Sequence, residues 1–566
     1  QSEVETSQNP QDAILKLLLH GHNLQFPHAS LSAMEDSCSE SSASSSEFDG
    51  GMYDDSEYAE MMPKDNAGVC FSWKSFAAYA GPGWLMSLAY LDPGNLESDL
   101  QSGAFTGYSL LWVLLLCTIA GLILQVLSAR LAMVTGRDLA QTCRAEYPRP
   151  LSILLWIMTE LAIIGADIQE VVGTGIALKV LFGWPLWVGS VATGADTFTF
   201  LMIHYLGKRF LEAFIFALIA VLLICYCINF AFMPPSAGPF LQGFLFECED
   251  YAVLQLVGTV GAVIMPHNLY LHSGICKERT CNRSDPEHVQ QANKYSAVDS
   301  AVALAVSFVI NAALVSTFAT GFFSTTCAGL ENGPLACLPH SDLSTFEGES
   351  ITCVTGAGTQ GTCGDIGLAD AGDTLRRLFG GHGEIGRTMF ALGLLAAGQA
   401  STMTGTMAGQ FVMEGFLDWR IPLWLRTLIT RLISLGPAVA IAVYTSHETN
   451  LNNQVDQWIN VLQSVQLPFA LLPVLHFNSD AQLMGKFRLT RFFRFICWML
   501  ALIVIAVNVY LIAQYAGTDR TGVRLLVKAI FFVAYGTLIT CTIWGDLKQG
   551  LSFLSSLIRS LVWKGR

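Results

Sequence analysis

The sequence predicts an all-α, polytopic membrane protein with a five-plus-five inverted repeat and two additional helices. Three observations predict this fold: the apolar composition, about twelve apolar runs of roughly 20 residues, and an interruption in the middle of the first and sixth runs. Of the 566 residues, 52% are hydrophobic and 13% are charged, and the mean hydropathy is +0.46. A water-soluble chain of this length could not expose so apolar a surface, so lipid must be the solvent.

Each predicted span is long enough to cross the hydrocarbon core as a helix. In chain order the predicted spans are 72–91 continued by 96–106, 109–134, 151–181, 185–206, 210–232, 251–265 continued by 267–276, 295–323, 385–413, 421–445, 455–477, 492–515 and 524–547. We interpret 71–232 as the first five-helix repeat and 251–477 as the second, because an interrupted helix opens each of them. Helices eleven and twelve, 492–547, lie outside the repeat.

Both ends of the chain are predicted to be cytoplasmic tails. Residues 1–70 are acidic and rich in serine, with too few large apolar side chains to form a core, which predicts disorder. This segment has no basic region followed by an apolar one, so it does not resemble a signal peptide. It contains Tyr58-Ala-Glu-Met61, a tyrosine-based pattern of the kind that sorting adaptors bind. Residues 548–566 are basic and amphipathic and would lie on an anionic lipid surface.

The charge distribution predicts the orientation in the membrane. Cytoplasmic loops carry an excess of Lys and Arg, and here every second loop is basic. The basic groups follow spans two, four, six, ten and twelve, and include Arg130, Arg137, Arg144, Arg149, Lys208, Arg209, Lys277, Arg279, Arg283, Lys294, Lys486, Arg488, Arg491, Arg494, Lys548, Arg559, Lys564 and Arg566. The net charge of −14 comes largely from the first tail and the loop around 325–373, so nucleic-acid binding is not expected.

The cysteines test this orientation independently, because disulfides persist on the oxidising side of a membrane. Four of them, Cys327, Cys337, Cys353 and Cys363, lie in the loop 324–384 between spans seven and eight. An even set in a loop rich in Gly, Ser and Thr predicts an external loop joined by disulfides, with the pairing open and unpaired thiols as the alternative. Cys276 and Cys281 are expected to be free thiols on the cytoplasmic side.

Two spans are interrupted by proline and polar residues at their centres. The first contains Asp92-Pro93-Gly94-Asn95 and the sixth contains Met265-Pro266-His267-Asn268. Non-helical backbone at membrane depth is tolerated only where it lines a cavity. Breaks five spans apart are typical of inverted-repeat transporters, whose substrate site lies between the halves at the midplane.

The chemistry of the breaks favours a divalent transition-metal ion. The Asp92 carboxylate, the Asn95 amide oxygen, a freed carbonyl at Ala262 and the Met265 thioether form a mixed hard and soft ligand set. Mg²⁺ and Ca²⁺ prefer shells of oxygen alone, so the thioether favours Mn²⁺, Fe²⁺, Co²⁺ or Cd²⁺. The alternative is structural: Asp92 as a helix cap and Met265 as core packing. A carboxylate at membrane depth costs roughly 2.5–3.5 kcal/mol on insertion scales, which favours function for Asp92.

These motifs, together with two further stretches, closely resemble the Nramp family (natural resistance-associated macrophage proteins), in its eukaryotic type. The further stretches are Gly398-Gln-Ala-Ser-Thr-Met-Thr-Gly-Thr406 and Gly409-Gln-Phe-Val-Met-Glu-Gly-Phe416, and the likeness runs from about Phe76 to Tyr515 and beyond. The resemblance implies a leucine-transporter-like fold and symport of a divalent metal ion with protons into the cytoplasm. It also implies Asp92, Asn95, Ala262 and Met265 as metal ligands. Asn460 stands where some bacterial members have a glutamine ligand, which leaves its role open.

Span three supplies the titratable groups that proton coupling needs inside a membrane. Glu160, Asp167 and Glu170 lie within roughly 80° of one another around a helix, which predicts a polar stripe facing the bundle. The resemblance implies that Asp167 accepts the proton and that Arg431 of span nine is its partner on the exit path.

Two histidines of span six are further candidates for the proton pathway. His267 and His272 lie five residues apart, about 140° around a helix, so they cannot both face one site. Imidazole titrates near neutral pH and binds metals, so a relay role and a ligand role are both open. The alternative is a histidine hydrogen-bonded within the bundle.

Three other functions fit the sequence less well than metal transport. A sodium-coupled amino-acid symporter of the same superfamily would not place Asp and Met at the centre of the breaks. A metal-sensing receptor without transport would not need the carboxylates of span three or Arg431. An enzyme is not expected, since the sequence has no H-E-x-x-H or comparable motif. We expect no resident cofactor, only transported Mn²⁺, Fe²⁺ and H⁺, and a location in the plasma or endolysosomal membrane.

Overall fold

A computed structural model describes residues 63–65, 71–195, 199, 202, 206–279, 281–330, 334–339, 351–419, 422–444, 449–515 and 522–544. The predicted acidic tail, apart from 63–65, lies outside the described residues, as do Tyr58–Met61 and the basic segment 548–566. All elements below belong to one compact unit of the chain.

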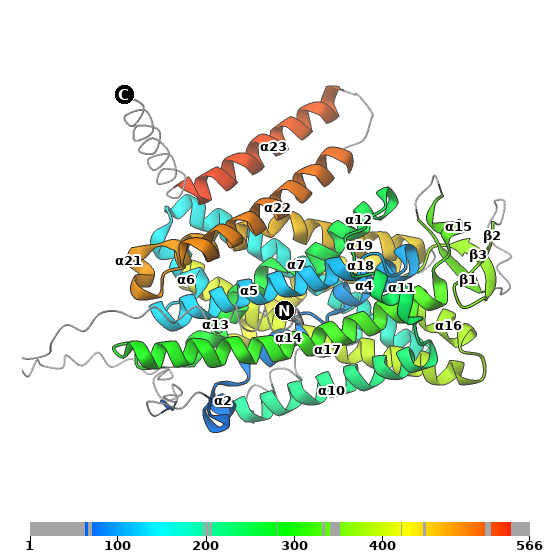
Figure 1. Ribbon diagram of the computed structural model, residues 1–566, viewed down its shortest axis with the longest axis horizontal. Helices are drawn as coiled ribbons and strands as arrows, with labels where there is room; N and C mark the ends of the chain where they lie inside the picture. Colours follow the sequence, from blue (N-terminus) through cyan, green and yellow to red (C-terminus); the bar gives the residue numbers. More distant parts are fainter. Residues whose placement is uncertain are drawn as a thin grey trace, which may run out of the picture. The chain divides into compact units, whose positions relative to one another are not determined.

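The described part of the chain is dominated by helices, and each predicted span has a helical counterpart (Figure 1). The helices are α2 (Trp73–Tyr79), α3 (Pro82–Leu88), α4 (Pro93–Thr106), α5 (Leu111–Thr135), α6 (Leu139–Glu146), α7 (Arg149–Phe182), α8 (Leu186–Ala192), α10 (Lys208–Phe232), α11 (Ala237–Gln242), α12 (Val253–Val263), α13 (Pro266–Glu278), α14 (Pro286–Phe322), α15 (Thr325–Ala328), α16 (Leu368–Leu378), α17 (Gly383–Leu417), α18 (Leu423–Tyr444), α19 (Thr449–Gln466), α20 (Pro468–Ser479), α21 (Ala481–Met484), α22 (Arg491–Tyr515) and α23 (Gly522–Thr542). Span four is described only in part, as α8 and a 3₁₀ turn at Thr193–Ala195.

Length and hydropathy independently mark the chain as a multi-pass membrane protein. Among the described residues, eight helical stretches are long and apolar enough to cross a bilayer. They are Leu111–Thr135, Arg149–Phe182, Phe210–Phe232, Asp250–Glu278, Pro286–Phe322, Thr427–Tyr444, Val455–Ser479 and Arg491–Tyr510. Leu186–Ala195 and Phe531–Thr542 are shorter apolar helices. The predicted all-α polytopic fold is therefore confirmed.

Both predicted interruptions are present. The first span is divided into α3 and α4 by the non-helical residues 89–92, and the sixth into α12 and α13 by residues 264–265. Proline opens the second half-helix in each case, where its missing N–H costs nothing and its fixed φ suits the first turn.

The expectation of one uninterrupted half-helix over 72–91 is wrong. The chain turns at Gly81, whose φ of +134° is open only to glycine at low cost, and α2 and α3 are separate helices. The carboxylate of Asp299 on α14 accepts hydrogen bonds from the backbone N–H groups of Gly81 (3.3 Å) and Gly83 (2.6 Å). The turn is held by a residue more than 200 positions away, which no local pattern could reveal.

The short helices α6, α11, α15, α16 and α21 and a sheet were not predicted. The helix α6 follows Asp138, whose side chain and that of Gln141 form a reciprocal capping box. It is too short and polar to resemble a span. The helix α16 lies within the loop predicted at 324–384, which is more ordered than the sequence suggested.

The helices of the two predicted repeats pack against each other in a reciprocal way. The half-helices α3 and α4 of the first broken span pack against α14, the next helix after the second broken span. The half-helices α12 and α13 of the second broken span pack against α5, the next helix after the first. The long helices α7 and α17 contact each other along the bundle, and α10 covers α17. Both breaks are therefore enclosed by helices from the other half of the chain.

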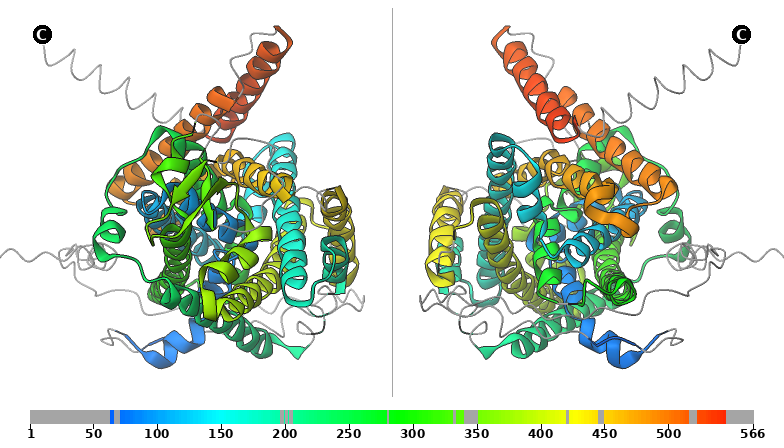
Figure 2. Two further views of the ribbon diagram at one scale, coloured as in Figure 1. Left: turned by 90° about the vertical axis from the view of Figure 1, so that its right-hand side faces the viewer. Right: turned by 90° about the vertical axis from the view of Figure 1, so that its left-hand side faces the viewer.

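The loop after α14 carries a small antiparallel sheet at one end of the helix bundle (Figures 1 and 2). Its strands β1 (Ala336–Pro339), β2 (Thr352–Val354) and β3 (Gln360–Gly364) have the order β1-β3-β2. Disulfides join Cys327 to Cys363 and Cys337 to Cys353, which confirms the predicted stapling and supplies the pairing that the sequence left open. Cys276 and Cys281 are free and buried, as expected.

Candidate metal centre

Each break leaves one alanine carbonyl without its usual helical partner. In a continuous helix the carbonyl of residue i accepts from the N–H of residue i+4. For Ala89 and Ala262 that residue is Pro93 and Pro266, which have no N–H. The side-chain amide of Asn95 reaches the Ala89 oxygen at 3.5 Å. The Ala262 carbonyl is thus available to a cation, as the predicted ligand set requires.

Asp92 and Asn95 lie together at the start of α4 and are buried. Oδ1 of Asp92 accepts from the backbone N–H of Asn95 (2.9 Å) and from its side-chain amide (2.7 Å). This arrangement caps the helix. The other two side-chain oxygens, Asp92 Oδ2 and Asn95 Oδ1, take no part in it. Both atoms are buried and have no hydrogen-bond partner among the described residues. A buried oxygen without a donor is costly, and a bound cation would satisfy both.

Met265 lies in the break of the sixth span with extended backbone (φ −74°, ψ 133°) and 2% of its surface exposed. The two broken spans contact each other, since α4 packs on α12 and α3 on α13. The Oγ of Ser98 on α4 lies 3.0 Å from Oγ1 of Thr259 on α12. The fold thus brings together the elements that carry the four predicted ligands: Asp92, Asn95, Ala262 and Met265.

Asn460 lies beside this site within a network of amides. Its Nδ2 donates to the carbonyl of Gly94 (3.2 Å), and its Oδ1 accepts from Nε2 of Gln169 on α7 (3.0 Å). Gln463 in turn donates to Oε1 of Gln169 (3.3 Å). Both side-chain atoms of Asn460 are therefore engaged by protein groups in this conformation, and they tie α19 to the break in α4.

Gln169 is a residue that the sequence analysis missed. It lies two positions after Asp167 on a helix considered only for its carboxylates. A Cβ on Gly94 would come within 2.6 Å of Gln169 Oε1, so the glycine of the first motif allows α7 to approach the break. The signal available in the sequence was a further polar residue, between Asp167 and Glu170, on an apolar span.

The carboxylates of span three meet the predicted arginine. Nη2 of Arg431 on α18 lies 3.3 Å from Oε2 of Glu170, and its Nη1 lies 3.9 Å from Oδ1 of Asp167. All three residues are buried, with 5% exposure or less. Glu170 also accepts a hydrogen bond from Ser401 on α17. Arg431 is nearer to Glu170 than to Asp167, whereas the resemblance implied Asp167 as its partner.

Close packing by α17 completes this cluster. A Cβ on Gly405 would lie 2.9 Å from Oδ1 of Asp167 and 3.1 Å from Oε1 of Glu170. The glycine of the third motif therefore admits the two carboxylates to the interface between α7 and α17.

Glu160 and His272 have neighbours outside the carboxylate cluster. Glu160 is only partly buried and accepts from Nε1 of Trp156 on its own helix (3.0 Å). Its position seven residues before Asp167 separates them by roughly 10 Å along the axis. His272 is fully buried and lies against Cys276 (3.7 Å) and Ser300 of α14 (3.5 Å).

His267 is the histidine nearer to the break. It occupies the first turn of α13, two residues after Met265, and is 4% exposed. Its Nδ1 has no hydrogen-bond partner among the described residues. The two histidines therefore have different surroundings, as their angular separation predicts.

The bundle interior holds other carboxylates that the sequence analysis did not single out as candidates. Glu97, Asp99, Asp299 and Asp456 are each 5% exposed or less. Glu97 on α4 accepts from the backbone N–H of Leu368, the first residue of α16 (2.7 Å), and from Gln101 (2.6 Å). It thereby ties the half-helix beside the metal centre to the disulfide-bonded loop. Asp456 lies one turn before Asn460 on α19.

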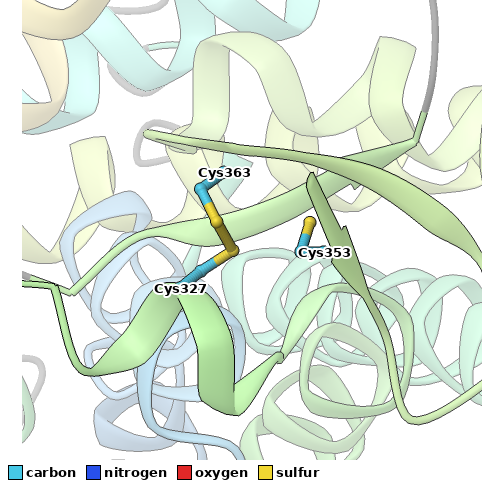
Figure 3. A group of neighbouring side chains, drawn as sticks. All are labelled: Cys327, Cys353 and Cys363. Carbon is cyan, nitrogen blue, oxygen red and sulfur yellow. A yellow bond between two sulfur atoms is a disulfide. The ribbon is translucent and has the colours of Figure 1, made fainter. Parts of the chain in front are cut away.

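A grouping of three potential metal ligands elsewhere in the described chain is not a metal site. The sulfur atoms of Cys327, Cys353 and Cys363 lie within 4.8 Å of one another (Figure 3). All three belong to disulfides, so none offers a thiolate. The candidate centre at the breaks differs because a single carboxylate works there with an amide, a carbonyl and a thioether.

Comparison with known proteins identifies relatives along most of the chain. Residues 83–514 match the family model Nramp, described as natural resistance-associated macrophage protein-like. The chain is 45% identical over 454 residues to the metal transporter nramp1 homolog of Dictyostelium discoideum, covering 79% of this chain and 76% of the relative. It is 43% identical over 495 residues to natural resistance-associated macrophage protein 2 of Mus musculus, covering 86% and 84%.

A solved structure shares the arrangement of helices. The crystal structure of the Eremococcus coleocola manganese transporter, in complex with an aromatic bis-isothiourea substituted compound, superposes with a TM-score of 0.70 at 29% identity. The match covers 86% of this chain and 97% of the other. The sequence and structural matches therefore agree over the membrane part.

Proposed function

The chain belongs to the Nramp family of metal transporters, and on that premise we propose that it carries divalent transition-metal ions, Mn²⁺ and Fe²⁺ foremost, into the cytoplasm together with protons. The metal ion is the cargo, and it would bind Asp92, Asn95, the Ala262 carbonyl and Met265 in the dehydrated space between the two breaks. Co²⁺ and Cd²⁺ are further cargo of the same chemistry.

One observation carries the proposal: Asp92 Oδ2 and Asn95 Oδ1 are buried oxygens to which no group of the described residues donates, next to helix breaks that free a carbonyl. A carboxylate in such a place is expensive unless a cation or a proton neutralises it. The thioether of Met265 favours a transition-metal ion over Ca²⁺ or Mg²⁺. The relative from Dictyostelium discoideum is named as a metal transporter, and the similar solved structure is that of a manganese transporter.

Proton coupling is proposed from the carboxylate cluster on α7. Glu170 and Asp167 share the single guanidinium of Arg431, so at most one of the two negative charges is neutralised by it. A proton held by the other carboxylate would be released or taken up as the charge at the nearby metal centre changes. His267, with its free Nδ1, would connect the metal centre to this route.

The alternating-access route and the orientation are part of the same proposal. We assign 71–232 and 251–477 as the two repeats, since α3 and α4 pack on α14 while α12 and α13 pack on α5. The loop with two disulfides would face the oxidising side, which places both termini in the cytoplasm.

The test is uptake into proteoliposomes that contain a dye quenched by metal ions. Wild-type protein should admit Mn²⁺ faster when the external side is acidic. Asp92→Ala should abolish uptake, and Met265→Ala should let Ca²⁺ or Mg²⁺ compete. Wild-type protein that binds Mn²⁺ in calorimetry but moves none under any gradient would overturn transport and favour a metal sensor. Uptake that depends on Na⁺ and an amino acid would favour the amino-acid symporter.

A further inference from the structure

One face of α19 carries three polar side chains and packs beside α7 and the broken first span. Asp456, Asn460 and Gln463 are spaced by four and three residues and therefore share a side of the helix. Asn460 and Gln463 both bind Gln169, and the backbone carbonyl of Asp456 accepts from the same glutamine (3.1 Å). The network fixes Asp456 one helical turn from the residue that touches Gly94.

The side chains of Asn460 and Gln463 both make hydrogen bonds, whereas the Asp456 carboxylate makes none among the described residues. Its side chain is buried, with 5% exposure for the residue, and in the described chain no N–H or O–H group donates to it and no basic side chain pairs with it. The amides of Asn460 and Gln463 are engaged with Gln169. A carboxylate buried in this way needs a cation or a proton.

Two buried carboxylates lie within electrostatic range of Asp456. It interacts electrostatically with Asp92 at the metal centre and with Glu97 on α4. Glu97 accepts hydrogen bonds from Leu368 and Gln101, whereas Asp92 Oδ2 is buried without a partner among the described residues. Like charges repel each other, and a divalent cation bound close to both carboxylates would be attracted to each of them.

The position of Asp456 lies on the side of the disulfide-bonded loop. The loop helix α16 packs against α19 and α4, and Glu97 binds the first residue of α16. Beside Asp456, polar groups connect α4, α12 and α19. Gln255 on α12 donates to the Ser98 carbonyl on α4 (2.9 Å), and Gln457 on α19 donates to Gln255 (3.4 Å). A cation that arrives from that side would meet polar side chains rather than apolar ones.

We propose that Asp456 is an outer binding residue for the transported divalent metal ion, which it holds before the ion passes to Asp92. This inference rests on the proposed function, since the ligand is the proposed cargo, and it adds a site one step from the centre. Asp456 collects the ion in a buried position, and repulsion between the two carboxylates in the empty state favours capture. Its removal weakens capture and leaves the central ligands intact.

The test measures initial rates of Mn²⁺ uptake against Mn²⁺ concentration in proteoliposomes, for wild type, Asp456→Asn and Asp456→Glu. We expect Asp456→Asn to raise KM about tenfold, equal to ~1.4 kcal/mol, and to leave the maximal rate within about twofold. Asp456→Glu keeps the charge and should stay near the wild-type KM. Asp456→Ser repeats the measurement if the Asn variant does not fold.

Matched controls are Asp365→Asn and Asp370→Asn, which remove acidic groups of the loop that also interact with Glu97. Equal KM increases in the controls would mean that the summed negative charge of this region attracts the ion, and would overturn a specific site at Asp456. An unchanged KM in Asp456→Asn would overturn it as well. A shifted pH dependence of uptake with the same KM would assign a proton to Asp456 and reject the metal. Loss of uptake in the wild type would instead refute the proposed function.

Discussion

Buried charged side chains in this protein differ in whether the chain itself satisfies them. Arg431 lies 3.3 Å from Glu170 and is enclosed with it in the bundle. Asp92 keeps one oxygen free of any donor among the described residues. A low-dielectric interior penalises an uncompensated charge. The first arrangement therefore needs no ligand, whereas the second is the one that we propose to bind an ion.

Arg431→Ala should destabilise the folded protein by about 3–5 kcal/mol, because it leaves Asp167 and Glu170 buried without a counter-charge. Denaturant titration in detergent micelles measures the change. The control is Arg144→Ala, whose pair with Asp418 is exposed and should be worth within about 0.5 kcal/mol. Equal shifts for the two variants would contradict a buried ion pair at Arg431.

At the scale of an element, proline interrupts a helix here only when the residues before it leave the helical region. Before Pro266, Ile264 and Met265 have ψ values of 77° and 133°. Before Pro468, Leu467 keeps helical dihedrals (φ −53°, ψ −42°), and its N–H bonds the Gln463 carbonyl at 3.0 Å. The junction of α19 and α20 is therefore nearly continuous, although it also carries a proline.

Pro266→Ala should lower the efficiency of Mn²⁺ uptake about tenfold, because an N–H at this position can bond the Ala262 carbonyl and withdraw it from the metal. Pro468→Ala is the matched control and should have little effect, since no break is present there. Uptake kinetics of both variants decide the matter. A larger loss in the control would show that the proline of α13 does not act by freeing a carbonyl.

The two disulfides should contribute unequally to the stability of the loop. Cys327 and Cys363 are 36 residues apart, whereas Cys337 and Cys353 are 16 apart. The chain-entropy model assigns each bond roughly 3–4 kcal/mol, with the larger value for the longer loop. Replacing each pair by serine and measuring resistance of the loop to proteolysis should rank them in that order. The reverse ranking would mean that packing, not chain entropy, dominates.

At the scale of the whole molecule, contacts at both ends of the broken first span hold it to the rest of the bundle. Near the strands, Glu97 on α4 binds α16. At the other end, Arg279 donates to the carbonyls of Ala78 and Ala80 (both 3.2 Å) and pairs with Glu212 of α10. Alternating access requires such contacts to break in turn, so the balance between them should set which side opens.

Arg279→Ala should open the side of the bundle away from the strands and expose Cys276, which is fully buried. We expect its alkylation rate to rise roughly fivefold to tenfold, as a shift of about 1 kcal/mol between two states would give. Arg376→Ala, which removes an exposed pair with Glu384 beside the loop, is the control and should leave the rate unchanged. No increase in the Arg279 variant would show that these contacts do not close that side.

The sequence by itself determined the elements whose physics is local. Lipid demands long apolar helices, so the spans could be predicted. It permits a break only at a cavity, so Asp92-Pro93 and Met265-Pro266 could be predicted as breaks and proposed as a site. The even set of cysteines likewise predicted a stapled loop. Boundaries were less certain where a distant residue decides them, as Asp299 does at Gly81.

Only the tertiary structure decided which distant polar groups meet. The sequence did not show that Gln169 and Asn460, 291 positions apart, bind each other, that Arg431 lies nearer to Glu170 than to Asp167, or which cysteines pair. Nor did it distinguish Glu97, which has donors, from Asp456, which has none among the described residues. Local pattern fixes which face of a helix a side chain occupies, but its partners depend on how helices from both halves pack. Those partners decide whether a buried charge is compensated.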